Sequence, residues 1–364
     1  MKIMSRGYAL RVLNLLCALD MARLLNRTLV VPPFRWVRRR GDARVSVGRL
    51  VDLRHLATFG VRVLAEDESG SVANALSASG VTTETIQGEG QPHRKNRMPR
   101  WRRDTWLAEG TRAPRADAGL VTVTCCLFWT WSLPADTALE AYAAFRYHPT
   151  LTAAARAAAA PLGGQYAAMH VRRGDKAVVD KAYSAVFGQR MGPSYFRQLA
   201  RREGIPDGAT LFVATDELDR TWFDPLIAAG QYTVRFVDDL DQRPLLEALT
   251  AFPQSLWADV LAILEQIVCV DAASGFVGSL PSTLSGHVVN ARAAAAHAMA
   301  SWRSLGAAAA DAASHPSPPL LFSKLHESCC DESTTRDWLD GGLVPGSADA
   351  DALPCLQHAG NPWC

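Results

Sequence analysis

The pattern of apolar and polar positions predicts a chain in which helices alternate with short buried strands. Apolar residues recur at helical spacing over Arg11 to Asn26. The apolar run Thr28 to Val31 follows directly and has the length of a buried strand, which Pro32 and Pro33 end. The same alternation returns throughout the second half of the chain. It is typical of α/β proteins with parallel sheets.

The rest of the first half is less regular. From Glu66 to Gly119 aliphatic residues become sparse, which favours long loops with one short helix. The other elements predicted before residue 161 are short segments at 45–53 and 61–64, a strand at 120–128, and helices at 138–146 and 151–160.

A break at Pro161 to Gly164 separates this half from a more regular one. The elements predicted after it are strands at 166–172, 210–215, 232–237 and 275–278, and helices at 193–203, 256–268 and 283–295. Beyond residue 300 the chain becomes Ala-rich and then Pro-rich. We therefore expect one domain over 1–160, a second over 161–300, and a cysteine-containing tail over 301–364.

Composition agrees with two domains and argues against nucleic acid as a partner. The 364 residues are 48% hydrophobic, which is enough material for two cores. The formal net charge is only +2, so no general attraction to nucleic acid is expected.

The eight cysteines do not have the spacing of a metal site, since no Cys-x-x-Cys pair occurs. Cys17 and Cys269 fall on apolar helix faces, and we predict that both are buried free thiols. Cys355 and Cys364, in a segment with little core material, are more typical of disulfide partners, which indicates an oxidising compartment.

No membrane span or signal peptide is predicted. The apolar stretch Tyr8 to Val31 is interrupted by charged side chains, and the first residues lack the apolar core of a signal peptide. From the sequence we expect either a cytoplasmic protein or a chain that begins after a membrane anchor.

The strand predicted to end at Arg172 delivers two adjacent arginines, Arg172 and Arg173, at its carboxyl end. Ligands of open α/β sheets bind at this edge. The planar guanidinium group suits phosphate because its donors match two phosphate oxygens at once. These arginines are therefore candidate phosphate ligands, and an exposed charged loop is the alternative.

A second stretch, Phe276 to Ser285, leads from a short strand through Gly278 and Ser279 into a helix whose first turn holds three hydroxyls. Ordinary N-capping needs one hydroxyl. The free N–H groups and positive end of a helix also bind anions. Together with the arginines, this turn predicts a two-sided site for a pyrophosphate.

These stretches resemble the GDP-fucose-dependent fucosyltransferases, namely the protein O-fucosyltransferases and α1,6-fucosyltransferases. His170 to Asp175 is similar to their His-x-Arg-Arg-x-Asp motif, with Lys176 extending the match, and Phe276 to Ser285 is similar to their second donor motif. Leu24 to Pro33 resembles the first helix–strand unit of protein O-fucosyltransferases.

The resemblance implies an α/β GT-B glycosyltransferase, with two Rossmann-like domains facing across a cleft. It implies an inverting transfer of fucose from GDP-fucose to a protein Ser/Thr hydroxyl or a glycan, with no metal or other cofactor. Arg172 would be the catalytic residue. The implied donor ligands are His170, Arg172, Arg173, Asp175, Lys176, Glu265 (as the carboxylate that recognises guanine), Ser282, Thr283 and Ser285.

The acceptor side departs from the family pattern. Gly7, Tyr8 and Arg11 match an acceptor-side segment, but Arg6 stands where some members carry a glutamate proposed as the base. A degenerate relative that binds nucleotide or glycan without turnover is therefore the alternative function. The family resemblance implies the lumen of the ER or Golgi, with a membrane partner only through an anchor absent from this sequence.

Two rival interpretations rest on single motifs. Asp239-Leu240-Asp241 follows a strand, as the metal-binding Asp-x-Asp of a GT-A transferase would, although acidic loops after strands are common. Gly278-Ser279-Leu280-Pro281-Ser282 departs from the Gly-x-Ser-x-Gly elbow of hydrolases.

Overall fold

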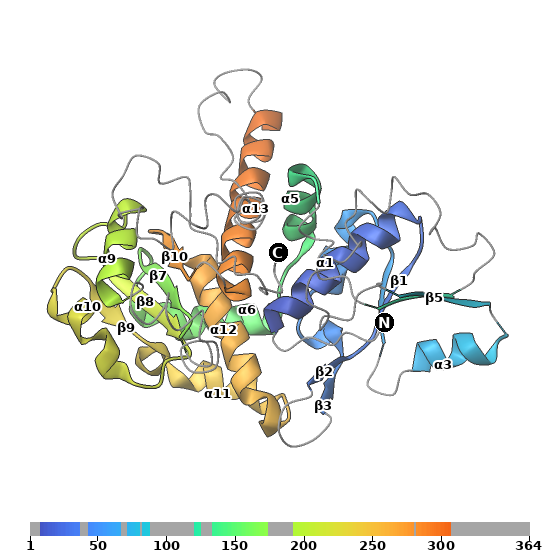
Figure 1. Ribbon diagram of the computed structural model, residues 1–364, viewed down its shortest axis with the longest axis horizontal. Helices are drawn as coiled ribbons and strands as arrows, with labels where there is room; N and C mark the ends of the chain where they lie inside the picture. The colour runs from blue at the N-terminus through green and yellow to red at the C-terminus, as the bar shows by residue number, and fades with distance from the viewer. Residues whose placement is uncertain are drawn as a thin grey trace, which may run out of the picture.

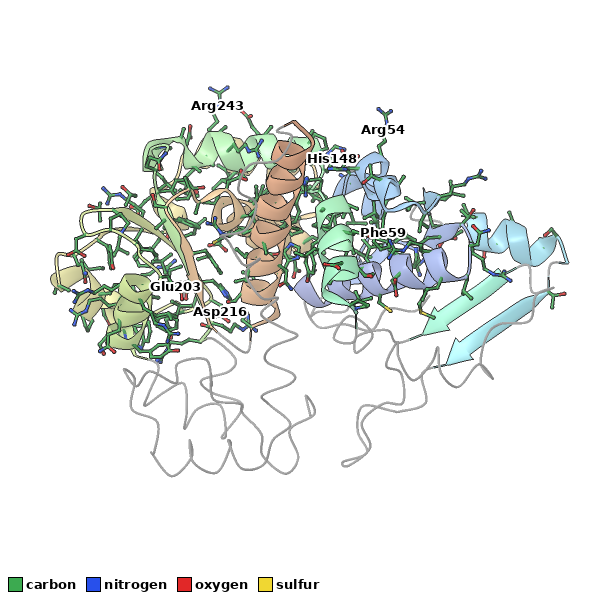
Figure 2. The ribbon with its side chains drawn as sticks, turned by 90° about the horizontal axis from the view of Figure 1, so that it is seen from above. Arg54, Phe59, His148, Glu203, Asp216 and Arg243 are labelled. Atoms are coloured by element: carbon green, nitrogen blue, oxygen red, sulfur yellow. The ribbon has the colours of Figure 1, made fainter. Side chains whose placement is uncertain are left out.

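The structure, a computed structural model, describes residues 8–36, 43–66, 71–80, 82–87, 120–124, 133–173, 192–279 and 282–306. Figure 1 shows two groups of elements, with α13 (Thr283–Gly306) and α5 (Ala135–Ala144) side by side between them. Figure 2 views the same arrangement from above, with Arg54 and Arg243 pointing outward.

The second half is built on a four-stranded parallel sheet. Its order is β10 (Phe276–Gly278), β7 (Ala167–Val171), β8 (Thr210–Thr215) and β9 (Thr233–Arg235). All five residues of β7 are buried, as expected of a central strand that is covered on both faces.

The alternation along β7 divides two apolar layers. Ala167, Met169 and Val171 belong to one layer, with Phe196 of α9 (Pro193–Arg202). Ala168 belongs to the other layer, with residues of α12 (Trp257–Asp271) and α13. The result is a sheet with helices on both faces, which sends the carboxyl ends of β10, β7 and β8 to one edge.

The first half consists of short paired strands and helices. Parallel pairs join β1 (Leu29–Val31) to β4 (Val63–Ala65) and β5 (Thr83–Gln87) to β6 (Leu120–Thr124), and an antiparallel pair joins β2 (Phe34–Trp36) to β3 (Ala43–Val45). The other elements in the described part of this half are α1 (Tyr8–Leu24), η1 (Val47–Arg49), α2 (Leu53–Leu56), η2 (Ala57–Phe59), α3 (Ser71–Ala78), α5 and α6 (Pro149–Ala159), which η4 (Ala160–Leu162) follows.

Most predicted elements occur within a few residues of their expected bounds. The opening helix and strand, the strand carrying the arginines and the helix after the second motif are confirmed. Between Glu66 and Gly119, α3 agrees with the one short helix that was predicted, and β5 is an addition. The structure also adds α10 (Asp224–Ala228) and α11 (Gln242–Thr250). The helix predicted to end at residue 295 continues to Gly306 as part of α13.

One apolar core runs through both halves. It includes Leu16 of α1, Ala141 of α5 and Leu151 of α6 together with Ile263 of α12 and Val288 of α13. α6 lies before the boundary that we predict at residue 160, and it packs on α11 and α12. The domain limits stay predictions.

Cys17 is disulfide-bonded, so the prediction that it is a free thiol was wrong. An apolar helix face does not distinguish the two states, because a disulfide is itself apolar. Cys269 is a buried free thiol, as predicted. Among the described helices, none combines the length and apolar character needed to cross a membrane. The tail after Gly306 lies outside the described residues.

Candidate active site

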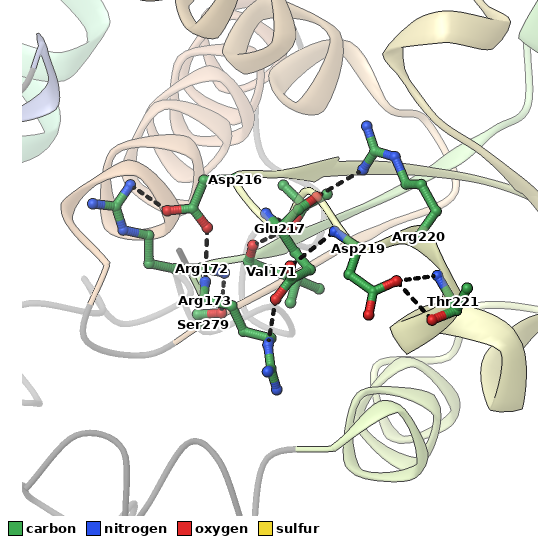
Figure 3. A network of polar contacts seen from close by, with 10 residues as sticks. Val171, Arg172, Arg173, Asp216, Glu217, Asp219, Arg220, Thr221 and Ser279 are labelled. Carbon is green, nitrogen blue, oxygen red and sulfur yellow. Dashed lines mark hydrogen bonds and ion pairs between the residues drawn. The ribbon is translucent and has the colours of Figure 1, made fainter. Parts of the chain in front are cut away.

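Arg172 lies just beyond β7, at the carboxyl edge of the sheet. Its Nη1 is 2.8 Å from Oδ2 of Asp216, which follows β8 (Figure 3). The side chains of Arg172 and Asp216 are 36% and 29% exposed, so the guanidinium is reachable from solvent. A phosphate arriving at this edge could bind a guanidinium whose direction the carboxylate already restricts.

Arg173 is more deeply tied into the protein than its neighbour. Its backbone N–H donates to Oδ1 of Asp216 at 2.7 Å, and its Nε donates to Glu217 at 2.8 Å. Its guanidinium also lies 4.6 Å from the ring centre of Trp222. Burial alone would raise the pKa of Glu217, but hydrogen bonds from the Asp219 N–H and from Arg173 lower it. Arg173 therefore anchors the edge, whereas Arg172 is the more exposed of the pair.

His170, the last but one residue of β7, is 3% exposed. Its Nδ1 lies 2.7 Å from the hydroxyl of Ser285 in the first turn of α13. Burial, and secondarily the charge of Arg172, lower the pKa of His170 to about 3. The imidazole is therefore neutral near neutral pH.

The turn from β10 into α13 lies against the end of β7, as the two motifs together predicted. The hydroxyl of Ser279 accepts the backbone N–H of Arg172 at 2.9 Å. Ser282 is buried, and its N–H donates to the Ser279 carbonyl at 3.1 Å. The 24-residue helix α13 begins at Thr283. The structure thus brings the first arginine and the amino end of a long helix to one place, and such helix ends attract anions.

Glu265 lies in α12, is half-buried, and is influenced by the charge of Asp216 at the same edge. Burial raises its pKa to about 8, with the positive charge of Arg220 opposing the shift and the carboxylates of Asp238 and Asp216 adding to it. The Arg220 guanidinium lies 4.4 Å from the ring centre of Phe236 and 3.6 Å from Asp238. Near neutral pH, Glu265 is mostly protonated.

Several predicted site residues lie partly or wholly outside what the structure describes. Gly7, Asp175 and Lys176 are outside the described residues. Tyr8 and Arg11 lie in α1, and Thr283 begins α13, with only the backbone described for these three. Their roles stay predictions.

Sequence reasoning missed Asp216 and Glu217 as parts of this site, and it placed Ser279 in the second motif without giving it a role. The two acidic residues follow β8 directly, and parallel strands place their carboxyl ends at one edge. That position was the available signal, but it becomes informative only once β8 is known to pair with β7.

The acidic motif at 239–241 has a structural explanation. Asp239 accepts the N–H of Phe236 at 2.7 Å, and Asp241 accepts the N–H of Arg243 at 3.0 Å as the N-cap of α11. No group of three or more His, Cys, Asp or Glu side chains among the described residues has an arrangement that could hold a metal ion.

No protein-family model matches this chain, and no curated protein matches its sequence. Solved structures match it in fold. POFUT1 in complex with GDP is 14% identical, with 79% of this chain and 92% of that chain covered and a TM-score of 0.52. POFUT1 in complex with GDP-fucose is 12% identical, with 79% and 91% covered and a TM-score of 0.51. The fucosyltransferase NodZ from Bradyrhizobium is 14% identical, with 78% and 89% covered and a TM-score of 0.48.

The class of fold follows from the POFUT1 likeness together with the parallel α/β sheets. The chain has the GT-B glycosyltransferase fold, and the predicted fold class is confirmed. The family resemblance drawn from the motifs agrees with this likeness in fold to POFUT1.

Proposed function

We propose that this chain is a fucosyltransferase that moves fucose from GDP-fucose to a protein Ser/Thr hydroxyl or a glycan, with inversion and without a metal. The observation that carries the proposal is the meeting of Arg172 with the turn into α13 at the carboxyl edge of the sheet. The likeness to POFUT1, which was solved with GDP and with GDP-fucose, supports the choice of donor.

The chemistry needs a stabilised leaving group. The bond between fucose C1 and the phosphate oxygen breaks, and GDP departs with the electron pair. The acceptor oxygen bonds to C1 and gives up its proton, which the departing diphosphate can take up. Negative charge then grows on the diphosphate. Arg172 and the amino end of α13 are fixed donors that would face this charge, and each such donor contributes roughly 3–4 kcal/mol to transition-state stabilisation.

The other assignments belong to the same proposal. His170, Arg173, Ser282 and Thr283 would surround the nucleotide, and Glu265 would recognise the guanine base. A location in the ER or Golgi lumen rests on the family resemblance alone.

A nucleotide-binding relative without turnover is the second candidate, and one observation favours it. Arg6 occupies the position at which some relatives carry a glutamate proposed as the base. This candidate would be favoured if the protein binds GDP but releases no GDP from GDP-fucose with any of a panel of acceptors.

The deciding experiment is calorimetric titration with GDP-fucose, GDP and UDP-glucose in EDTA, beside Arg172→Ala. We expect the guanine nucleotides to bind selectively and the variant to lose about tenfold or more in affinity, since a charge-assisted phosphate contact is removed. Equal affinity for UDP-glucose, or no binding by folded protein, would overturn the proposal. If EDTA abolishes fucose transfer in an activity assay, only the claim that no metal is needed would be overturned.

A further inference from the structure

Ser279 links β7 to the turn that precedes α13 through both its backbone and its side chain. Its backbone N–H donates to the carbonyl of His170 at 3.0 Å. Its hydroxyl donates to the same carbonyl at 3.2 Å and accepts the N–H of Arg172 at 2.9 Å. The residue is completely buried.

This bonding uses the only hydrogen of the Ser279 hydroxyl. The hydroxyl therefore has no hydrogen left to donate to a phosphate while it holds the His170 carbonyl. The Ser279 hydroxyl instead holds the backbone N–H of Arg172. The direction of that backbone decides where the guanidinium lies at the edge of the sheet.

Ser285 also bonds to β7, but its partner is a side chain and not the backbone. The hydroxyl of Ser285 lies 2.7 Å from His170 Nδ1, and Ser285 is completely buried. Gly278 permits this approach, because a Cβ there would lie 2.5 Å from the Ser285 hydroxyl oxygen. Two buried serines, one after β10 and one in the first turn of α13, thus bond to His170 of β7 and to Arg172 just beyond it.

We propose that Ser279 is a positioning residue for donor binding, which acts through Arg172 by fixing its backbone, and that Ser285 positions His170 in the same way. This inference rests on the proposed function. It moves Ser285 from direct contact with the donor, where the sequence placed it, to support of a donor ligand.

The test is a double-mutant cycle in GDP affinity, with wild type, Ser279→Ala, Arg172→Ala and the double variant titrated to millimolar GDP. Ser279→Ala removes both hydrogen bonds of the hydroxyl, including the one that holds the Arg172 N–H, which predicts about a tenfold loss of GDP affinity. If Ser279 acts through Arg172, the same substitution costs less than about twofold when Arg172 is already alanine, because coupled residues are not additive.

Ser274→Ala is the matched control. The Ser274 hydroxyl donates to the Gln165 carbonyl at 3.0 Å, and its N–H donates to the Tyr166 carbonyl at 3.0 Å. It therefore joins the same two segments at the opposite end of β7. We expect its GDP affinity to stay within about twofold of wild type, since a single hydrogen bond far from the site affects stability only.

The outcomes separate the two proposals. Three results would overturn the positioning role and leave the proposed function intact. Ser279→Ala could bind GDP as tightly as wild type, it could lose the same affinity whether residue 172 is arginine or alanine, or Ser274→Ala could lose as much affinity as Ser279→Ala. A folded wild-type protein without affinity for GDP would overturn both. The inference is supported if Ser279→Ala loses GDP affinity only in the protein that keeps Arg172.

Discussion

The carboxylate of Asp216 lies 2.8 Å from the guanidinium of Arg172, at the edge of the sheet where the two strands that precede them end side by side. This pair is partly exposed, whereas the adjacent pair of Arg173 and Glu217 is 20% and 16% exposed. Two neighbouring arginines therefore have different environments, and their substitution should affect stability to different extents.

We predict that Arg173→Ala destabilises the protein more than Arg172→Ala. A partly exposed ion pair contributes about 0–1 kcal/mol. Loss of the more buried pair leaves Glu217 without its guanidinium and removes the contact with Trp222, which should cost about 1–3 kcal/mol. Urea denaturation of both variants measures the difference. The reverse ranking would contradict our assignment of Arg173 as the anchor.

The two buried histidines predict a loss of stability in acid. Burial lowers the pKa of His170 to about 3 and that of His287 to about 4, against an ordinary value near 6.5. Below pH 6.5 the unfolded chain gains protons that the folded chain does not. Stability is therefore fully present above pH 6.5 and falls by about 1.4 kcal/mol per pH unit for each histidine.

His287→Gln isolates one of these contributions. His287 is completely buried, with Nε2 2.8 Å from the Tyr147 hydroxyl, and burial alone lowers its pKa. The unfolding free energies of wild type and variant, measured by urea denaturation, should approach each other by about 1.4 kcal/mol per unit as pH falls from 6.5 to 4. A constant difference over that range would show that His287 titrates normally.

Glu265 predicts a proton release on GDP binding. Its pKa is raised to about 8, so near pH 7 the carboxyl group holds a proton. Guanine presents N–H donors, and hydrogen bonds to the ionised form would favour loss of that proton. Calorimetry at pH 7 in buffers of different ionisation enthalpy should show close to one proton released. Glu265→Gln provides the control and should release less, while an unchanged release in that variant would remove Glu265 from the base site.

Gly278 predicts a packing limit at the turn into α13. A Cβ there would lie 2.5 Å from the Ser285 hydroxyl oxygen and 3.1 Å from the Phe276 ring. Gly278→Ala should therefore cost about 1–3 kcal/mol in urea denaturation, as overpacked sites do. Gly164→Ala is the control, because a Cβ there meets nothing within 4 Å. Equal stabilities of the two variants would show that the residues around Gly278 can move to make room for a methyl group at no cost in stability.

By itself the sequence determined the elements and the chemistry that they carry. Apolar periodicity is a local property, so it predicts a strand ending in Arg172 and a helix beginning near Ser282 wherever the rest of the chain lies. The family resemblance added the GT-B fold, because its motifs occur in the expected order. The sequence did not predict the short helix α11. Its nine residues directly follow an acidic run that has the composition of a loop.

Only the tertiary structure decided which side chains share the site. Ser279 meets Arg172 across 107 residues, and Glu217 meets Arg173 across 44. Both contacts exist because β7 pairs with β10 on one side and with β8 on the other, and strand order is not written in local periodicity. The same order decided that the hydroxyl of Ser285 faces His170, where the sequence had suggested a phosphate. Hydrogen-bond partners and burial depend on that packing, and so do the pKa values of His170 and Glu265.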